Sequence, residues 1–366
     1  MTVSLLIAGG GTGGHLFPGV AVARELLARV PGAAVTFVGT AAGIEARVIP
    51  REGLTLETIR SAGLKGKSPA ALLRGLLLLP LSALDAWRVI SRRRPSVVIG
   101  VGGYSSGPVV ALAALRGVPT LLMEQNATPG LTNRLLSRLV KTAAVTYEES
   151  LATFGNKAFV AGNPVRPEFF APVPTMPAAG RTRVLVFGGS QGAHAINVAM
   201  ADAAVALAAA TPGVDVTHQT GERDLSMVRE AYGGAGLAAR VEPFLFEMDR
   251  EMRAADVIVC RAGATTLAEL TAAGRAAILI PLPTATDDHQ RRNADALVRQ
   301  GAARVIDQRE LTGARLADEL LGLARDAGGR ERMAAAARGM AKPDAARVIV
   351  DKVLALAGQP VGAGPS

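Results

Sequence analysis

Short apolar runs alternate along the chain with longer segments in which apolar residues recur every three or four positions. In the first half these runs cover residues 3–8, 35–38, 97–101, 120–123 and 143–146. In the second half they cover residues 184–187, 214–219, 257–260, 277–281 and 303–306. Because the runs are apolar at most positions, they are typical of parallel strands that helices cover on both faces. The alternation therefore predicts an α/β chain with doubly wound parallel sheets.

The pattern restarts in the middle of the chain, and one local sequence recurs across the two halves. The segments SVVIGVGG (residues 96–103) and DVIVCRAG (residues 256–263) each combine a strand, a glycine turn and the start of a helix. We therefore expect two similarly built domains, over residues 1–165 and 182–340. Prolines and a glycine predict a linker over residues 166–181. Residues 341–366 are expected to form a helix that returns to the first domain and a disordered tail.

Composition narrows the class of protein. Charged residues make up 19% and the hydrophobic class 49% of the 366 residues, which excludes a long disordered chain. A single cysteine, Cys260, excludes a disulfide scaffold and a cysteine-rich zinc site, and four histidines leave little for a histidine-rich metal centre. No apolar run reaches the ~20 residues of a membrane span, and the first residues lack the basic segment of a secretory signal.

Charge is distributed unevenly between the two halves. Residues 1–170 hold 18 Lys and Arg against 9 Asp and Glu, whereas residues 171–366 hold 22 of each class. An excess confined to the first half predicts an anionic partner for that half. Leucines interleave there with basic residues, which suits an anionic membrane surface, where each basic residue contributes ~1 kcal/mol. The residues concerned are Lys65, Lys67, Leu72, Leu73, Arg74, Leu76, Leu77, Leu78, Leu79, Trp87, Arg88, Arg92, Arg93, Arg94, Leu131, Arg134, Leu135, Leu136, Arg138, Leu139 and Lys141.

Two alternatives to a membrane surface would also produce this basic, leucine-rich pattern. An ordinary amphipathic core helix with a solvated face would show the same spacing, and the charge asymmetry is what favours a membrane. Nucleic acid is the second anionic partner to consider, but aromatic residues are 4% of the chain and form no stacking platform. We therefore expect membrane contact and no nucleic-acid binding.

Three glycine-rich turns follow predicted strands and open predicted helices, at residues 9–14, 102–106 and 188–192. Glycines let the backbone approach a ligand, and the N–H groups at a helix start favour an anion such as phosphate. Three such turns predict phosphates or sugars at the crevice of open α/β sheets. For any single glycine, a tight left-handed turn without a ligand is the more ordinary role.

The first turn also matches the dinucleotide pattern G-x-G-x-x-G, which requires an acidic residue at the end of the second strand. That strand ends in Val38, Gly39 and Thr40, and Glu45 falls in the next predicted helix, which weakens the interpretation as a nicotinamide-dependent oxidoreductase. His15 opens the first helix, where the positive end of the dipole disfavours imidazolium. A neutral His15 can act as a general base, and a capping or packing histidine is the alternative.

Seven motifs occur in order along nearly the whole chain. They are GGGTGGHLFP (residues 9–18), GGYSSGP (102–108), EQN (124–126), GNPVR (162–166), GGSQGA (188–193), CRAGATTLAE (260–269) and DHQ (288–290). Together they resemble the MurG family of bacterial UDP-N-acetylglucosamine transferases, which convert lipid I to lipid II. The resemblance implies the GT-B fold, in which two Rossmann-like domains face each other across a cleft. It also implies an inverting transfer of GlcNAc from UDP-GlcNAc to the C4 hydroxyl of MurNAc in undecaprenyl-pyrophosphoryl-MurNAc-pentapeptide.

The resemblance places the donor mainly on the second domain. It implies that Glu269 accepts both ribose hydroxyls, that the backbone of Leu245 meets uracil and that Ser190 holds the diphosphate. The other donor residues that it implies are Thr12, Gly13, Gly14, Asn126, Arg166, Ala264, Thr265, Thr266, Leu267, Ala268 and Gln290. Some have ordinary alternatives, because Glu269 can compensate a helix dipole and Asn126 can be a turn residue.

The acceptor that the resemblance implies is a membrane-bound lipid pyrophosphate. Its candidate cradle is Gly11, Gly103, Tyr104 and Ser105. The base that takes the acceptor proton is expected to be His15, with Glu124 as second choice. The family commonly has a histidine before Glu-Gln-Asn, where this chain has Met123, and we expect Met123 in the core. The chain has no Asp-x-Asp motif, and we expect no metal and no cofactor.

The same resemblance implies a peripheral protein on the cytoplasmic face of the cell membrane, acting in peptidoglycan synthesis, cell shape and division, with other cell-wall synthesis proteins as partners. Three alternatives stay open. A diacylglycerol glycosyltransferase would share the architecture and the membrane surface. A UDP-GlcNAc epimerase would share the donor fold but leave the basic half unexplained. A non-enzymatic membrane-binding protein would explain the charge, but not three glycine turns together with Glu269 and Gln290.

Overall fold

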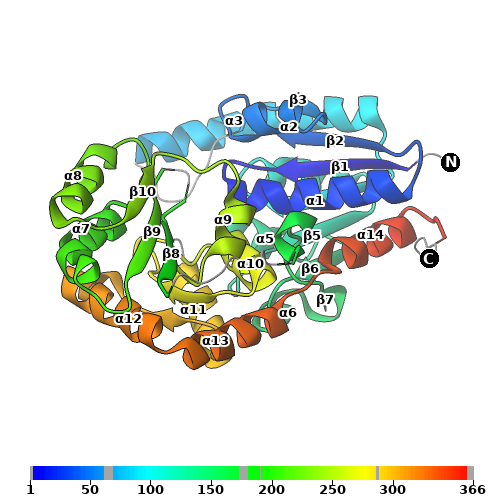
Figure 1. Cartoon of the computed structure of the whole chain (residues 1–366). Coiled ribbons are helices and arrows are strands. Elements are labelled where there is room, and N and C mark those ends of the chain that lie inside the picture. The colour runs from blue at the N-terminus through cyan, green and yellow to red at the C-terminus, as the bar shows by residue number, and fades with distance from the viewer. Residues whose placement is uncertain (1–2, 62–68, 173–179, 190, 286–287, 361–366) are drawn as a thin grey trace. The chain divides into compact units, whose positions relative to one another are not determined.

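The computed structural model describes residues 3–61, 69–172, 180–189, 191–285 and 288–360, with the backbone alone for residues 69–77. The chain forms two compact units (Figure 1). Unit 1 comprises Met1–Val165 and Lys342–Ser366, and unit 2 comprises Arg166–Ala341. The chain therefore leaves unit 1 and returns to it. The predicted linker, residues 166–181, belongs to unit 2 where the structure describes it.

Unit 1 is built on a seven-stranded sheet with the strand order β3-β2-β1-β4-β5-β6-β7, in which neighbouring strands are parallel. The strands are β1 (Ser4–Gly9), β2 (Ala34–Gly39), β3 (Thr55–Thr58), β4 (Val97–Gly102), β5 (Thr120–Glu124), β6 (Thr142–Val145) and β7 (Ala158–Val160). Strand β4 is buried over its whole length, as expected for a strand covered on both faces.

Helices cover both faces of this sheet. They are α1 (Gly13–Arg29), α2 (Glu45–Arg51), α3 (Pro69–Arg93), α4 (Ser106–Leu115), α5 (Leu131–Leu136), α6 (Leu151–Phe154) and α14 (Ala345–Leu356), with 3-10 turns at Glu148–Ser150 and Gly155–Lys157. Successive strand residues point to opposite faces. Leu5 therefore packs in the core cluster that contains residues of α1 and α14, whereas Leu6 packs in the cluster with α3 and α4.

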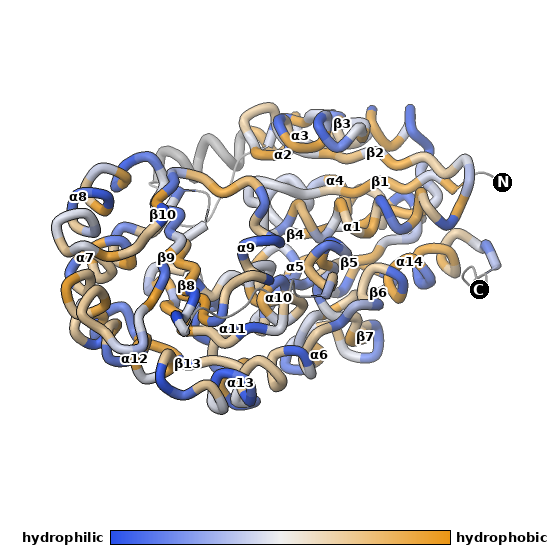
Figure 2. Tube along the Cα trace, in the orientation of Figure 1, coloured by the Kyte–Doolittle hydropathy of each residue, from blue (hydrophilic) through white to orange (hydrophobic). Residues whose placement is uncertain are grey.

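Unit 2 is built on a six-stranded parallel sheet with the strand order β10-β9-β8-β11-β12-β13. The strands are β8 (Thr182–Phe187), β9 (Val214–Gln219), β10 (Ala239–Glu242), β11 (Val257–Cys260), β12 (Ala276–Leu279) and β13 (Arg304–Val305). The helices are α7 (His194–Ala208), α8 (Leu225–Ala235), α9 (Met248–Ala254), α10 (Ala264–Ala273), α11 (His289–Arg299), α12 (Gly313–Arg325) and α13 (Ala327–Met340), with 3-10 turns η3 (Pro167–Phe170) and η5 (Gln308–Glu310). Figure 2 shows that β8 consists mainly of hydrophobic residues, whereas α8 includes hydrophilic segments.

The structure confirms the predicted fold class of two doubly wound parallel sheets, and each predicted apolar run overlaps a strand. It adds β3, β7 and β10, which the sequence pattern does not reveal. These strands lie at sheet edges and are only partly buried. Polar or charged residues interrupt β3 and β10, and β7 is only three residues long. Helix α1 begins at Gly13, so His15 lies in its first turn, as expected, and Pro18 lies inside the helix.

Candidate active site

The first two glycine turns meet at the carboxyl ends of β1 and β4, which are neighbours in the sheet of unit 1. Gly9 has φ 144°, and a Cβ there would collide with the carbonyl oxygen of Gly102. A Cβ at Gly103, with φ 80°, would lie 2.5 Å from the carbonyl oxygen of Gly10. The two turns therefore pack backbone against backbone, and only glycine fits the contact. Ligands of open α/β sheets bind at this edge.

The side chain of Glu45 is hydrogen-bonded to the first glycine turn. This residue begins α2, as expected, but its buried carboxylate reaches back to the end of β2. It accepts hydrogen bonds from the Gly11 N–H at 2.9 Å, the Thr40 N–H at 2.8 Å and the Thr40 hydroxyl at 3.1 Å. The Gly11 N–H, which was predicted to meet the acceptor pyrophosphate, is thus already paired with an internal carboxylate. Sequence reasoning noticed Glu45 but not where its side chain would lie.

His15 is held in one tautomer by a residue that the site prediction did not include. The Gln125 side chain is buried and donates from Nε2 to the carbonyl oxygen of Val101 at 3.1 Å. Its Oε1 must therefore face His15 Nδ1, 3.2 Å away, as an acceptor. The proton of a neutral His15 then lies on Nδ1, and Nε2 keeps a free lone pair. This arrangement suits a general base at the start of α1.

Glu124, the second-choice base, is buried, with 3% of its surface exposed. Its Oε1 accepts from the Asn126 N–H at 3.0 Å and from Asn126 Nδ2 at 3.2 Å. Its Oε2 accepts from the Gly130 N–H at 3.0 Å and from Asn133 Nδ2 at 2.8 Å. Both oxygens are engaged by donors that shape the loop after β5. Glu124 therefore orients Asn126 and is poorly placed to take a proton from a substrate. Met123 is buried in the core, as expected.

The second glycine turn presents the remaining candidates for the acceptor cradle. Tyr104 is exposed, and Ser105 is buried at the start of α4 without a side-chain capping bond. Thr12 is exposed at the corresponding position before α1, and it also makes no side-chain capping bond. Uncapped helix starts leave backbone N–H donors for a ligand. An anion at this edge of unit 1 therefore fits the starts of α1 and α4 better than Gly11.

In unit 2 the third glycine turn follows β8 and precedes α7. Ser190, predicted to hold the diphosphate, lies outside the described residues. Gly192 has φ 71°, and a Cβ there would collide with the carbonyl oxygen of Thr220 in the loop after β9. Helix α7 begins after Ala193 without a side-chain capping bond. The turn is thus a backbone cradle at a helix start, as a diphosphate site requires.

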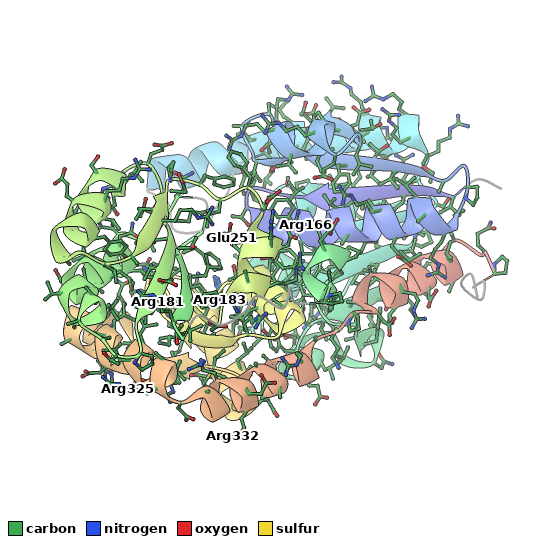
Figure 3. The ribbon with its side chains drawn as sticks, viewed as in Figure 1. Arg166, Arg181, Arg183, Glu251, Arg325 and Arg332 are labelled. Atoms are coloured by element: carbon green, nitrogen blue, oxygen red, sulfur yellow. The ribbon has the colours of Figure 1, made fainter. Side chains whose placement is uncertain are left out.

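Glu269 lies in the second turn of α10, and burial raises its pKa to about 7, against a smaller lowering by Arg166. Arg166 stacks over the Phe169 ring at 5.1 Å. Figure 3 shows this arginine close to α9, against which η3 packs. The predicted nucleoside segment forms the first turn of α10, where Ala264, Thr265 and Leu267 are buried and Thr266 and Ala268 are partly exposed. A carboxyl with this pKa can accept hydroxyl donors when it is ionised.

The loop between β12 and α11 is held by two polar side chains. Gln290 accepts the Leu282 N–H at 3.0 Å through Oε1, which leaves its Nε2 for a ligand. Arg261 follows β11 and donates to the carbonyl oxygens of Ile280 at 3.0 Å and Pro281 at 3.3 Å. Burial lowers the pKa of Arg261. The prediction included Gln290 but missed Arg261, which stands beside Cys260 in the same motif.

Leu245 is buried, and its N–H donates to the side chain of Gln219 at 2.7 Å. Its carbonyl oxygen is the backbone atom of this residue that remains for a base. Among the described residues, no group of three or more His, Cys, Asp or Glu side chains is arranged to hold a metal ion. The predicted donor residues Thr12, Gly13, Gly14 and Asn126 lie in unit 1, and the other described ones lie in unit 2.

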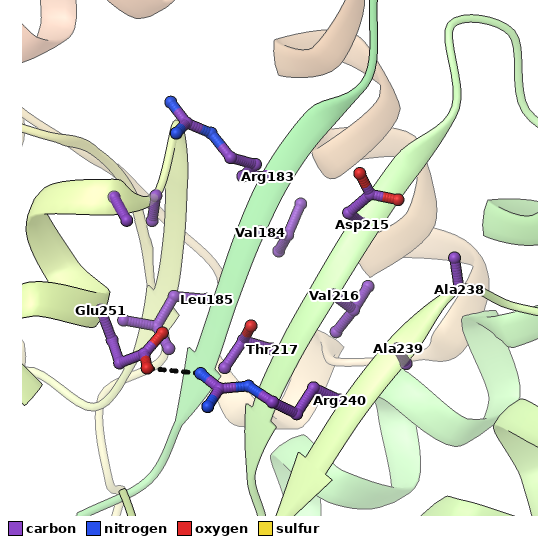
Figure 4. Close-up of a pocket in the computed structure, with 12 residues that line it drawn as sticks. Arg183, Val184, Leu185, Asp215, Val216, Thr217, Ala238, Ala239, Arg240 and Glu251 are labelled. Carbon is purple, nitrogen blue, oxygen red and sulfur yellow. Dashed lines mark ion pairs between the residues drawn. The ribbon is translucent and has the colours of Figure 1, made fainter. Parts of the chain in front are cut away.

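A hollow of about 320 Å³ in unit 2 lies over one face of β8, β9 and β10 (Figure 4). It is lined by Leu185, Thr217 and Arg183 of the sheet, and an ion pair between Arg240 and Glu251 joins β10 to α9 there. Arg183 stands near the amino end of its strand, whereas nucleotides bind at the carboxyl ends of parallel strands. We therefore do not assign this hollow to the donor.

Two protein-family models match the chain. The model of the glycosyltransferase family 28 N-terminal domain matches residues 5–145. The model of the glycosyltransferase family 28 C-terminal domain matches residues 183–349. The two matches fall in unit 1 and mainly in unit 2, respectively.

Relatives match over almost the whole chain. A UDP-N-acetylglucosamine--N-acetylmuramyl-(pentapeptide) pyrophosphoryl-undecaprenol N-acetylglucosamine transferase from Pelobacter propionicus is 47% identical, covering 96% of this chain and 99% of the relative. A protein of the same name from Geotalea uraniireducens is 48% identical, covering 96% and 98%. The crystal structure of Acinetobacter baumannii MurG superposes with a TM-score of 0.79 at 31% identity, covering 96% and 99%. A putative UDP-N-acetylglucosamine 2-epimerase from Listeria monocytogenes (TM-score 0.68, 14% identity, 97% and 96% covered) shares the fold alone.

Proposed function

The chain belongs to the MurG family within glycosyltransferase family 28, and from this premise we propose that it transfers GlcNAc from UDP-GlcNAc to lipid I. The bond formed is β-1,4, to the C4 hydroxyl of MurNAc in undecaprenyl-pyrophosphoryl-MurNAc-pentapeptide, and the product is lipid II. The observation that carries the proposal is the similarity, along both units, to relatives that bear this activity in their name. The roles of individual residues below are part of the proposal.

The donor binds at the carboxyl edge of the unit 2 sheet. Ionised Glu269 accepts the two ribose hydroxyls, a task suited to a carboxylate with two acceptor oxygens. The Leu245 carbonyl accepts the N3–H of uracil. The turn before α7, with Ser190, binds the diphosphate, and Gln290 donates to a sugar hydroxyl from its free Nε2.

The reaction is a direct displacement at the anomeric carbon. The C4 hydroxyl attacks from the face opposite UDP, which inverts the linkage from α to β. His15 Nε2 takes the hydroxyl proton, because the bond from Nδ1 to Gln125 leaves Nε2 as the basic atom. Negative charge develops on the leaving diphosphate, and the N–H groups at the start of α7 together with Arg166 stabilise it.

Lipid I enters with its pyrophosphate at the starts of α1 and α4. Tyr104 and Ser105 border this edge, and the neutral N–H groups of two helix starts favour an anion. Because Gly11 is paired with Glu45, the pyrophosphate lies away from that amide. Asn126, whose side chain donates to Glu124, is a further proposed contact of the donor.

An exposed apolar surface of unit 1 contacts the membrane that holds lipid I. Helices α3 and α4 pack together, as do α4 and α5. Among the described side chains, the exposed large ones of α3 and of the segment around α5 are Leu79, Leu81, Leu84, Trp87, Leu131, Leu135 and Leu139, which we call the leucine surface. Exposed Arg88, Arg134, Arg138 and Lys141 surround it. Such a surface with a basic rim binds anionic lipid.

Some residues of the predicted membrane surface are placed differently or not described. Leu136 is buried, so it is not part of the leucine surface. Lys65 and Lys67 lie outside the described residues, as do the side chains of Leu72, Leu73, Arg74, Leu76 and Leu77. Among the described residues, no helix combines the length and the apolar character needed to cross a bilayer. We propose a peripheral location at the cytoplasmic face of the membrane, and through lipid II a part in cell-wall biogenesis, cell shape and division alongside other cell-wall synthesis proteins.

The decisive experiment is transfer of radiolabelled GlcNAc from UDP-GlcNAc to lipid I in detergent, with diacylglycerol as competing acceptor and with EDTA present. The expected result is label on lipid I, undiminished by EDTA. Label on diacylglycerol alone would keep the donor site and move the activity to glycolipid synthesis. Binding of UDP-GlcNAc without product on either acceptor would make an epimerase the next activity to assay.

A further inference from the structure

Gln219 is the last residue of β9, which lies between β8 and β10 in the unit 2 sheet. A side chain at the carboxyl end of a middle strand can reach the loops that follow both neighbours. The loop after β8 is the third glycine turn, and the loop after β10 carries Leu245. The Gln219 side chain is 2% exposed, so its amide must be satisfied inside the protein.

The Gln219 amide joins these two loops. Its Nε2 donates to the carbonyl oxygen of Gly189 at 2.9 Å, and its Oε1 accepts the Leu245 N–H at 2.7 Å. A primary amide offers a donor and an acceptor on one rigid plane, as this bridge requires. A carboxylate offers only acceptors and an aliphatic side chain offers neither. The bridge thus specifies glutamine chemically and not only by size.

Two backbone bonds reinforce the same junction. The Thr220 N–H donates to the carbonyl of Glu242 at 3.0 Å, and the Gly221 N–H donates to that of Pro243 at 3.1 Å. Gly221 has φ 75°, and a Cβ there would collide with the carbonyl oxygen of Gln191 in the third glycine turn. The loop after β9 is therefore packed against both neighbouring loops, with Gln219 as the side chain that connects them.

We propose that Gln219 is a positioning residue that sets the distance between the phosphate turn and the base loop for a uridine diphosphate. This inference rests on the donor site of the proposed function. Gln219 touches neither the base nor the phosphates directly. By taking the Leu245 N–H it leaves only the carbonyl for the base, which favours uracil, with its N3–H donor, over cytosine, whose N3 is an acceptor. Gln219 therefore affects both donor affinity and base selectivity.

The test compares UDP and CDP binding by calorimetry for the wild type, Q219L, Q219E and T217V. Thr217 lies two residues earlier on the same face of β9 and lines the hollow of Figure 4, away from both loops, so T217V is the matched control. Q219L is expected to weaken UDP binding about tenfold, since two buried hydrogen bonds are lost. CDP binding falls less, because the released Leu245 N–H can donate to cytosine N3. T217V binds UDP like the wild type.

Two further readouts separate positioning from general damage. In transfer assays Q219L raises the KM for UDP-GlcNAc and leaves the KM for lipid I unchanged. For Q219E, the ratio of its UDP affinity to that of the wild type improves as pH falls from 8 to 5. A protonated carboxyl can donate to the Gly189 carbonyl and accept the Leu245 N–H, whereas the carboxylate cannot donate and adds negative charge near the diphosphate.

Several outcomes would overturn the inference. If the wild type binds UDP and Q219L binds it equally, Gln219 is only a core residue, and the proposed function stands. The same conclusion follows if Q219L loses UDP and CDP affinity equally while Q219E shows no pH-dependent recovery. If Q219L does not fold, Q219N serves in its place, since it keeps the amide on an arm one methylene shorter and cannot bridge both loops. A wild type that does not bind UDP would refute the donor site and this inference together.

Discussion

The first and the third glycine turns have the same kind of sequence, yet the buried side chains that hydrogen-bond to them differ: one is an acceptor and the other a donor. At the first turn, the Glu45 carboxylate accepts a hydrogen bond from the Gly11 N–H. At the third turn, the Gln219 amide donates a hydrogen bond to the Gly189 carbonyl. A carboxylate occupies an N–H donor of the turn and brings negative charge. An amide that donates to a carbonyl of the turn leaves the turn's N–H donors for a ligand. The side chain behind a glycine turn therefore decides whether the turn can hold an anion, and the glycines alone do not.

The comparison assigns different tasks to the two turns. In the first turn the Gly11 N–H is already bonded to Glu45, so this turn fixes where α1 begins and thereby positions His15. The third turn faces the start of α7 with no carboxylate bonded to its described residues, which suits the diphosphate of a donor. Changes near the first turn should therefore affect the chemical step, and changes around the third should affect donor binding.

The largest expected effect is on His15. H15A should lower kcat about 10²–10⁴-fold, because general-base catalysis contributes that much, and should leave the Kd for UDP within about twofold. Single-turnover transfer with saturating lipid I and calorimetry with UDP measure the two quantities. Q125L is the companion variant, since it releases Nδ1 of His15 and should lower kcat by a smaller factor. Unchanged turnover in H15A would remove His15 as the base.

E45Q tests the neutralised first turn directly. A glutamine of the same shape must turn an NH₂ group toward the Gly11 or Thr40 N–H, so we expect the free energy of unfolding to fall by about 1–3 kcal/mol. Denaturant unfolding measures the loss, and E52Q is a control because the Glu52 carboxylate pairs with Arg24 near the surface. Tighter pyrophosphate binding by E45Q would sharpen the comparison by showing that the carboxylate excludes an anion. An E45Q protein as stable as the wild type would contradict it.

The raised pKa of Glu269 makes donor binding depend on pH. Below its pKa of about 7 the carboxyl is protonated and accepts ribose hydroxyls poorly, so UDP affinity should rise about tenfold from pH 6 to pH 8. Because the folded protein holds this proton more tightly than an unfolded chain does, the ligand-free protein should lose stability as pH rises from about 4.5 to about 7. E269Q should bind UDP weakly at every pH. A wild-type affinity that is flat over this range would argue against Glu269 as the ribose ligand.

The smallest expected effect is on membrane binding, and it compares the surfaces of the two units. R134E/R138E should weaken binding to vesicles of anionic lipid, since each basic residue contributes ~1 kcal/mol at such a surface, and added salt should mimic the change. R325E/R332E on α12 and α13 is the control for unit 2 and should bind vesicles like the wild type. Sedimentation with vesicles measures both. Equal loss in both variants would show that net charge matters and the leucine surface does not.

The sequence could predict what is repeated or continuous along the chain. Apolar runs located the central strands, and the glycine turns located the edges where ligands bind. Strand β10 could not be found this way, because its charged residues Arg240 and Glu242 interrupt any apolar run and only Val241 is buried. The roles of Glu45, Gln125 and Gln219 could not be found either. Each depends on a contact between residues that lie far apart in sequence, and no local pattern shows which atoms of a buried amide or carboxylate face which partner.

The return of the chain to unit 1 has a consequence for the order in which the protein can fold during synthesis. Helix α14 places Ile349, Val350 and Val353 in the same core cluster as Leu16 of α1. Every residue of unit 2 leaves the ribosome before those three do. The unit that is completed first is therefore the inserted one, and the unit that is begun first stays open along one face until the last helix emerges.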